Sequence, residues 1–265
     1  MPVLLVIPAR YASTRYPGKP LAVLRGASGE ARSLIRRSWE AAVSVGGIDR
    51  VVVATDDQRI AEASAAFGAE VVMTPESCRN GTERCAAVAA ELPGYDLVVN
   101  LQGDAPLTPA WFVSALVEAM RADPSAPVAT PVLRCDDTAL AGFLEDRRNG
   151  RVGATTAVFD ASWRALYFSK EVLPYTGRPL GPEEVIPVFH HVGVYAYRRD
   201  ALLAYPAWPV GPLETWEGLE QLRFMENGTA VRCVEVDGRG RSFWELNNPS
   251  DVERIEAILR ELGLD

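Results

Sequence analysis

The sequence has little lysine, little histidine and no paired cysteines. Its 265 residues include two lysines, Lys19 and Lys170, and two histidines, His190 and His191. The four cysteines show no CxxC spacing, so we expect reduced thiols and not a zinc site. The net charge of −8 leaves no basic surplus to neutralise a phosphate backbone, which argues against nucleic acid as a partner.

The sequence also lacks a membrane-spanning segment, a signal peptide and the motifs of three enzyme classes. No apolar run approaches the roughly 20 residues of a membrane span, and no signal peptide opens the chain. We therefore expect a cytoplasmic protein with no membrane partner. No GxGxxG follows the first predicted strand, and neither GxxxxGK[ST] nor GxSxG occurs. These absences disfavour a dinucleotide oxidoreductase, a P-loop enzyme and an α/β-hydrolase.

The most informative stretch that is present lies at the beginning of the chain. The apolar run Val3–Ile7 stops at Pro8, which is typical of a strand buried on both faces. The loop after it carries Arg10, Arg15 and Lys19. Guanidinium forks and a compact ammonium suit a polyphosphate ligand, and the first loop of an open α/β sheet is a usual ligand site. A solvated basic loop is the alternative, although the prolines within the stretch favour a rigid loop.

Strands and helices alternate through the first half. We predict strands at Val3–Ile7, Arg50–Thr55, Glu70–Met73 and Asp96–Leu101. We predict helices at Ser33–Val45, Arg59–Phe67 and Asn80–Leu92, and a further helix that begins at Thr108 or Pro109 and runs to Arg121. This alternation indicates an α/β fold with a mostly parallel, Rossmann-like sheet and crossover helices on both faces.

The pattern changes after about residue 125. Strands are predicted at Val128–Leu133, Thr155–Asp160, Ala165–Phe168, His190–Tyr197 and Val231–Val236, with a polar link at Glu145–Arg151. Helices are predicted at Arg199–Tyr205, Leu213–Glu226 and Pro249–Leu262. No linker composition separates the halves, so residues 1–265 are expected to form one domain. About residues 1–125 would form the half that binds the polyphosphate ligand of the basic loop. About residues 126–265 would extend the sheet.

Two polar motifs follow the predicted strands. Asn80-Gly81-Thr82 opens a helix, where Asn and Thr are good caps and Gly allows close approach. Capping alone and recognition of a base or sugar both explain it. Gln102-Gly103-Asp104 follows a strand, where a carboxylate can hold Mg²⁺ beside a phosphate or simply start a turn. Because the carboxyl ends of parallel strands lie along one rim, we expect these motifs to meet the basic loop.

Two further groups of polar residues lie in the second half. In an alternating strand His191 would share a face with Gly193 and Tyr195, which leaves room for a ligand, although a lone inward histidine is usually a core residue. One helix carries several acidic and amide side chains, for which a solvated face is the default expectation: Glu214, Glu217, Glu220 and Gln221. Its buried side would comprise Trp216, Leu219 and Leu222.

Seven motifs together resemble one enzyme family over nearly the whole chain. They are, in order, IPARYASTRYPGKPL, VVVATDD, NGTER, NLQGDAP, ALYFSKEVLPY, HHVGVYAYR and PLETWEGLEQLR. This series is similar to the pattern of the 3-deoxy-manno-octulosonate (Kdo) cytidylyltransferases. The resemblance implies a nucleotidyltransferase α/β fold with an inserted smaller subdomain for dimerisation and acceptor binding. It also implies a homodimer, CTP as donor and Mg²⁺ as cofactor.

The resemblance also implies roles for individual residues. The catalytic cations that hold the triphosphate would be Arg10, Arg15 and Lys19. The remaining CTP-binding residues would be Pro8, Ala9, Asn80, Gly81, Arg84, Gln102 and Asp104. The acceptor would contact Gln102, Lys170, His191, Tyr195, Glu214 and Gln221. The metal ligands would be Asp104 and Asn247.

The chain departs from the family pattern at five of its positions. Asn80 stands for a serine, Ala105 for a glutamate, and Asn247 for the aspartate that is the second metal ligand. Lys170 replaces an arginine and Thr156 replaces a lysine. An amide oxygen can coordinate Mg²⁺ without charge, so metal affinity should fall. The donor half is kept, whereas the acceptor half differs.

The function expected from the resemblance is transfer of CMP from CTP to an acidic acceptor of the Kdo type, with release of pyrophosphate. An ionised acceptor oxygen needs no general base. Positioning and charge neutralisation would therefore supply most of the reduction in the activation barrier. The changed acceptor half leaves two alternatives open. One is CMP transfer to a small phosphonate such as phosphonoformate, and the other is an inactive CTP-binding homologue.

Overall fold

A single large sheet organises the computed structural model, which describes residues 1–12, 16–103, 106–152, 154–178, 184–241, 246 and 248–265. Over these residues the sheet has ten strands in the order β5-β4-β1-β6-β11-β7-β10-β8-β9, and β12 pairs with β7. The strands of the first half are β1 (Val3–Ala9), β4 (Arg50–Thr55), β5 (Glu70–Met73) and β6 (Leu97–Leu101). All neighbouring pairs among these four strands are parallel, which confirms the predicted parallel sheet.

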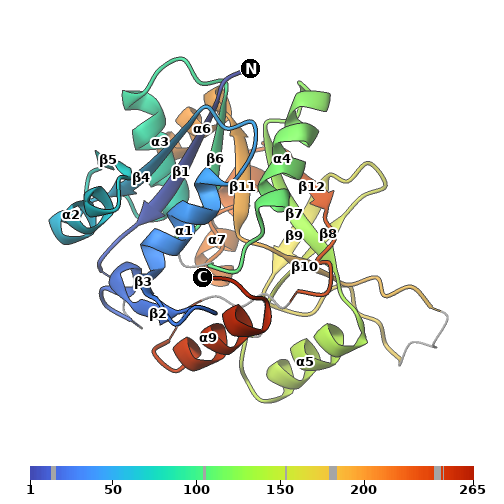
Figure 1. Ribbon diagram of the computed structural model, residues 1–265. Coiled ribbons are helices and arrows are strands. Elements are labelled where there is room, and N and C mark those ends of the chain that lie inside the picture. Colours follow the sequence, from blue (N-terminus) through green and yellow to red (C-terminus); the bar gives the residue numbers. More distant parts are fainter. Residues whose placement is uncertain (13–15, 104–105, 153, 179–183, 242–245, 247) are drawn as a thin grey trace.

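Helices cover both faces of this sheet. Figure 1 shows α1 (Leu34–Val43) and α4 (Ala110–Ala122) in front of it, and α3 (Gly81–Glu91) and α6 (Arg199–Ala204) behind it. The front helices and α2 (Gln58–Ala66) share one apolar cluster with β1, and the rear helices share a second. Every residue of β1 is buried because side chains on both of its faces meet helices.

The second half extends the sheet with antiparallel pairs. Its strands are β7 (Val128–Arg134), β8 (Thr155–Phe159), β9 (Ala165–Ser169), β10 (Phe189–His191), β11 (Val194–Arg198) and β12 (Val231–Glu235). Strand β11 lies antiparallel to β6, with Val194 opposite Leu101. The beginning of β11 therefore lies at the carboxyl end of β6.

The predicted continuous strand His190–Tyr197 is wrong. The chain forms two strands, β10 and β11, which lie on opposite sides of β7. Between them a tight turn closes when the N–H of Val194 donates to the carbonyl of Val192 at 2.7 Å. The hydroxyl of Thr130 on β7 donates to the carbonyl of Val194 at 2.8 Å and holds the crossing chain. Alternation in sequence does not reveal such a crossing, because each short strand keeps the same period.

The predicted helix Leu213–Glu226 and its solvated acidic face are also wrong. Two short helices, α7 (Pro212–Glu217) and α8 (Leu222–Glu226), are separated where Gly218 adopts φ of +63°. Trp216, expected on the buried side, is 88% exposed. The left-handed glycine ends the first helix and reorients the second, so the helical period does not continue across it.

The predicted polar link at Glu145–Arg151 is largely helix. Helix α5 runs over Asp137–Arg148, and the carboxylate of Asp136 caps it by accepting from the N–H of Ala139 at 2.7 Å. None of its residues is fully buried, and it packs through Leu140 and Phe143. The weak apolar face explains why the helix was not predicted.

A third apolar cluster joins the C-terminal helix to the segment after the basic loop. Helix α9 (Asp251–Glu261) packs near a hairpin of β2 (Val23–Arg25) and β3 (Ala31–Ser33), at the bottom of the view in Figure 1. The cluster comprises Leu24, Leu34, Leu107, Leu246, Ile255 and Leu259. Short 3-10 turns, η1 (Lys19–Leu21) and η2 (Tyr205–Ala207), complete the elements. Within the described ranges no helix is long and apolar enough to cross a membrane.

We expect Ile255→Ala to lower the free energy of unfolding by about 2–5 kcal/mol, because the side chain is fully buried and its removal leaves a cavity. Ile258→Ala, on the same helix at a partly buried position, is the matched control and should cost less. Urea unfolding of both variants measures the difference. Equal losses would contradict the packing described for α9.

Candidate active site

Three sequence-distant segments meet at the carboxyl ends of the parallel strands. A Cβ built on Gly103 would lie 3.0 Å from the carbonyl oxygen of Pro8, so the segment after β6 lies against the end of β1. A Cβ on Gly81 would lie 3.0 Å from Nε2 of Gln102, so the start of α3 also touches this segment. The predicted convergence at one rim is confirmed. Glycine at both positions allows this close approach.

The basic loop leaves this rim from the end of β1. Arg10 is exposed, and its Nη1 donates to the carbonyl of Arg79 at 3.4 Å, just before α3. Lys19 begins η1 and is partly buried. Arg15 lies outside the described residues. Arg10 therefore lies at the same rim as the start of α3.

Asn80 caps α3, and its side chain also reaches a second element. Its Oδ1 accepts from the N–H of Glu83 at 2.8 Å, and its Nδ2 donates to the hydroxyl of Tyr205 at 3.0 Å. The capping role is thus confirmed, and the recognition role remains a prediction. Arg84 is buried, pairs with Asp56 at 2.7 Å and hydrogen-bonds Thr74. Its guanidinium therefore ties α3 to the segments that follow β4 and β5.

Glu220 is the member of this site that sequence reasoning did not select. Its carboxylate accepts from the N–H of Thr82 at 3.0 Å and from Nε2 of Gln102 at 3.0 Å. Burial raises the pKa of this carboxyl. The helical pattern predicts a solvated face for this residue, because the pattern continues across Gly218, where the helix in fact ends. A glycine in the middle of an otherwise helical pattern was the available signal.

A second group of polar side chains comes from β10, β11 and the residue that precedes α8. The hydroxyl of Tyr195 donates to Oε1 of Gln221 at 3.0 Å, and the rings of His191 and Tyr195 lie 5.6 Å apart. Nε2 of His191 hydrogen-bonds the hydroxyl of Thr130 at 2.8 Å. Burial, with a smaller effect of its histidine neighbour, lowers the pKa of His191 to about 3. His191 is therefore neutral at physiological pH.

Two buried polar atoms in this region have no hydrogen-bond partner among the described residues. They are Nε2 of Gln221, a donor, and Oδ1 of Asn100, an acceptor. Asn100 lies directly opposite Tyr195 in the β6–β11 pair. Buried polar groups are normally paired, so this donor and this acceptor are available to a polar ligand or to water.

Two residues that are predicted to bind the acceptor substrate, Glu214 and Lys170, have different contacts from this group. Glu214 is buried and pairs with Arg223 at 2.6 Å, so its carboxylate is already engaged. Nζ of Lys170 lies 3.1 Å from a Cβ built on Gly218, and its backbone N–H donates to Glu217 at 2.9 Å. The structure thus groups His191, Tyr195 and Gln221, and it places Lys170 beside the break between α7 and α8.

Thr156 is the position where the resemblance leads us to expect a lysine. Its side chain hydrogen-bonds to backbone groups. Its buried hydroxyl donates to the carbonyl of Glu171 at 2.7 Å and accepts from the N–H of Leu173 at 3.2 Å. These bonds fix the chain directly after Lys170. The substitution therefore removes a cation and leaves a hydroxyl that shapes the turn.

The candidate metal ligands, Asp104 and Asn247, lie outside the described residues. Their chain neighbours Leu107 and Leu246 belong to the same apolar cluster. One carboxylate and one amide oxygen suit Mg²⁺, which takes few protein ligands and keeps several waters. The donor set thus fits the ion. Within the described part of the chain, no group of three or more His, Cys, Asp or Glu side chains could hold a metal.

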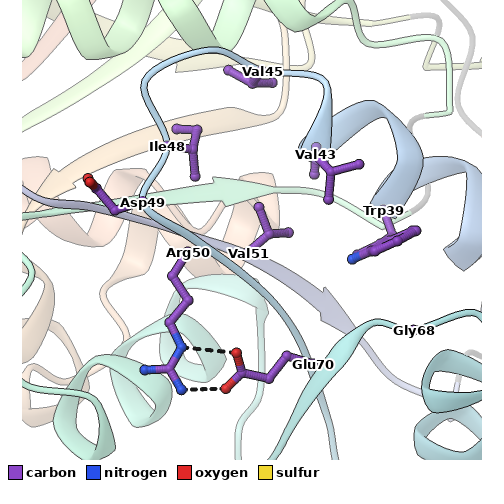
Figure 2. A pocket seen from close by; sticks show the side chains of 10 residues that line it. Trp39, Val43, Val45, Ile48, Asp49, Arg50, Val51, Gly68 and Glu70 are labelled. Carbon is purple, nitrogen blue, oxygen red and sulfur yellow. Dashed lines mark hydrogen bonds and ion pairs between the residues drawn. The ribbon is translucent and has the colours of Figure 1, made fainter.

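A separate surface pocket lies at the opposite ends of the strands. Figure 2 shows Trp39, Val43 and Ile48 around it, with Arg50 and Glu70 joined by an ion pair. Arg50 and Glu70 are the first residues of β4 and β5. The pocket is therefore remote from the rim where the polar motifs meet.

The chain matches the model of the cytidylyltransferase family over residues 4–235. It is 47% identical over 264 residues to the 3-deoxy-manno-octulosonate cytidylyltransferase of Maricaulis maris, with 99% of each chain covered. It is 42% identical to the enzyme of that description from Syntrophotalea carbinolica, covering 99% of this chain and 100% of the relative.

A solved structure of CMP:2-keto-3-deoxy-manno-octonic acid synthetase complexed with CTP superposes with a TM-score of 0.83 at 34% identity. The match covers 99% of this chain and 100% of that one. A 4-diphosphocytidyl-2C-methyl-D-erythritol synthase from Anaerococcus prevotii shares the fold with a TM-score of 0.60 at 12% identity, covering 98% and 96% of the two chains. These likenesses confirm the predicted nucleotidyltransferase fold.

We expect the free energy of unfolding to fall as the pH drops from 7 to 5, partly because of His191. Its folded pKa of about 3 lies below the ordinary 6.5, so between these values the unfolded chain binds the proton and the native chain does not. This histidine then contributes a slope of up to about 1.4 kcal/mol per pH unit below 6.5. His191→Gln should give a shallower slope in urea unfolding at pH 7, 6 and 5. Identical slopes would show that His191 is not held neutral.

Proposed function

This chain belongs to the cytidylyltransferase family, and we propose that it transfers CMP from CTP to Kdo with release of pyrophosphate. The observation that carries the proposal is the match of 34% identity and TM-score 0.83 to a synthetase complexed with CTP. The relatives named above are described as 3-deoxy-manno-octulosonate cytidylyltransferases, which supports Kdo as the acceptor. None of these comparisons supports a phosphonate acceptor.

The geometry at the strand ends supports two adjoining substrate sites. Arg10, Asn80, Gly81 and Gln102 form a polar rim on the donor side, and Lys19 follows Gly18, whose N–H donates to the carbonyl of Tyr11. A second wall on the acceptor side consists of His191, Tyr195 and Gln221. The amide of Gln102 lies against Gly81 and donates to Glu220, the residue that precedes Gln221. A residue in this position would border both CTP and the acceptor.

The proposed reaction is a displacement at the α-phosphorus of CTP. An ionised acceptor oxygen forms the new O–P bond, the bond between the α- and β-phosphates breaks, and pyrophosphate leaves with its electron pair. Arg10, Arg15 and Lys19 would bind the triphosphate and neutralise the charge that develops on it. The attacking hydroxyl oxygen of Kdo would lose its proton to solvent water before it attacks, so no side chain has to remove that proton. Neutral His191 would instead orient the acceptor through hydrogen bonding.

Magnesium is the proposed cofactor, and Asp104 and Asn247 would hold it. When bound, the ion would offset negative charge on the phosphates. Replacement of the family's second carboxylate by Asn247 predicts a weaker metal site than that of a two-carboxylate relative.

We also propose a homodimer that works in the cytoplasm. Apolar side chains exposed in the second half support an interface there. Leu166 is 59% exposed on β9, the last strand of the sheet, and Trp216 is 88% exposed on α7. Side chains of this kind are enriched in protein–protein interfaces.

Pyrophosphate release from CTP and Mg²⁺ should be measured with Kdo and with phosphonoformate in parallel. Release with Kdo at a rate well above the acceptor-free control is the expected result. Release with the phosphonate alone would refute Kdo as the acceptor. No release with either acid, together with measurable CTP binding, would identify an inactive homologue.

The two lysines provide a matched pair for assigning the two sites. Lys19→Ala should lower kcat/KM for CTP by about 10²–10³-fold, because it removes a donor to the triphosphate. Lys170→Ala should raise KM for Kdo and leave KM for CTP within about twofold. Steady-state kinetics with each substrate varied in turn separates the effects. A fully active Lys19→Ala enzyme, or equal effects of both variants on CTP, would contradict the assignments.

A further inference from the structure

The two ends of the basic loop meet at Tyr11. The N–H of Gly18 donates to the carbonyl of Tyr11 at 2.9 Å, which joins the two ends of the loop. Gly18 adopts φ of +70°, and a Cβ at this position would lie 2.9 Å from Cε2 of the Tyr11 ring. A side chain here would displace the aromatic ring, so glycine permits both the backbone conformation and the contact.

Arg59 covers a face of the same ring from α2. Its guanidinium carbon lies 3.4 Å from the centroid of the Tyr11 ring, in the geometry of a cation–π contact. The carboxylate of Asp57 accepts from Nε of Arg59 at 3.0 Å and from Nη2 at 2.6 Å. The guanidinium is thus held in a plane by two parallel hydrogen bonds.

Asp57 is itself fixed to the sheet. Its Oδ1 caps α2 by accepting from the N–H of Arg59 at 2.9 Å, and its own N–H donates to the hydroxyl of Thr55 at 3.2 Å. Thr55 is the last residue of β4 and is buried. The Tyr11 ring is therefore connected through Arg59 and Asp57 to a rigid strand.

The loop ends fixed in this way carry two of the proposed triphosphate ligands. Arg10 directly precedes Tyr11, and Lys19 directly follows Gly18. The N–H of Lys19 donates to the carbonyl of Tyr16 at 3.2 Å, within the same closed loop. The contact between Tyr11 and Gly18 thus determines the separation of the backbones of Arg10 and Lys19.

We propose that Tyr11, covered by Arg59, is a positioning residue that pre-organises Arg10 and Lys19 for the triphosphate of CTP. The proposal rests on the proposed function and adds residues that contact the loop and not the reacting atoms. A loop fixed before the ligand arrives avoids the free-energy cost of ordering it on binding. The triphosphate then meets two cations that are already correctly spaced.

The test compares Tyr11→Ala, Tyr11→Phe and Arg59→Ala with the wild-type chain. Arg260→Ala is the control, because Arg260 has a side-chain exposure of 54% against 58% for Arg59 and is likewise paired with a carboxylate. Calorimetry measures CTP binding in the presence of Mg²⁺ without acceptor. Steady-state kinetics then gives kcat and the KM for each substrate, and circular dichroism checks the fold.

We expect Tyr11→Ala to raise both Kd and KM for CTP about tenfold, with KM for Kdo unchanged, because it removes the ring between the loop ends. Tyr11→Phe should stay within about twofold of wild type, since it keeps the ring that contacts Gly18 and Arg59. Arg59→Ala should weaken CTP binding about two- to fivefold, the size of one exposed cation–π contact. Arg260→Ala should change nothing.

Three results would overturn the proposal: unchanged CTP binding in Tyr11→Ala, equal increases in both KM values, or a Tyr11→Phe variant as weak as Tyr11→Ala. If Tyr11→Ala does not fold, Arg59→Ala decides, because it alters a largely exposed side chain. A wild-type chain that binds CTP but turns over neither acid would refute the proposed function. The comparison of CTP affinities would then still test Tyr11.

Discussion

The organisation of the site depends on the hydrogen bonds that the buried guanidinium of Arg223 makes with two carboxylates. The guanidinium is 1% exposed, donates twice to Glu214 at 2.6 Å and once to Glu83 at 2.8 Å, and lies 4.2 Å from the centroid of the Tyr205 ring. Burial opposes its charge, but the hydrogen bonds to Glu214 and Glu83 raise its pKa. Because a buried charge without partners is strongly destabilising, α3, α7 and α8 must keep their mutual arrangement.

That arrangement brings together the two substrate walls. Glu83 lies in the first turn of α3 and accepts hydrogen bonds from Arg79 as well as Arg223. Although burial favours the neutral acid, these bonds lower the pKa of Glu83. Glu220 extends the same connection from the α7–α8 segment to Gln102. Glu220 and Arg223 thus both hold the α7–α8 segment against the start of α3.

Much of the donor half could be predicted from sequence because its signals are local. The continuous apolar run of β1 and the Asn80 cap of α3 each depend on adjacent residues, and the structure confirms both. The engaged role of Glu214 depends instead on Arg223, nine residues later and beyond the helix break at Gly218. Hydrophobic periodicity carries no information about such a pair, and it therefore predicts a solvated face for Glu214 and Glu220, while the resemblance alone assigns Glu214 to the acceptor.

The antiparallel strand β11 has a consequence for how this protein can diverge. Strands β1 and β6 supply the donor rim from their ends, whereas β11 contributes Tyr195 near its beginning and pairs with Asn100 of β6. The two walls thus come from chain segments that enter the same rim from opposite directions. Lys170 lies on the connection after β9 and Thr156 lies in β8, so neither belongs to the basic loop. The architecture separates the part that must bind an unchanging nucleotide from the part on which selection for a new acceptor can act.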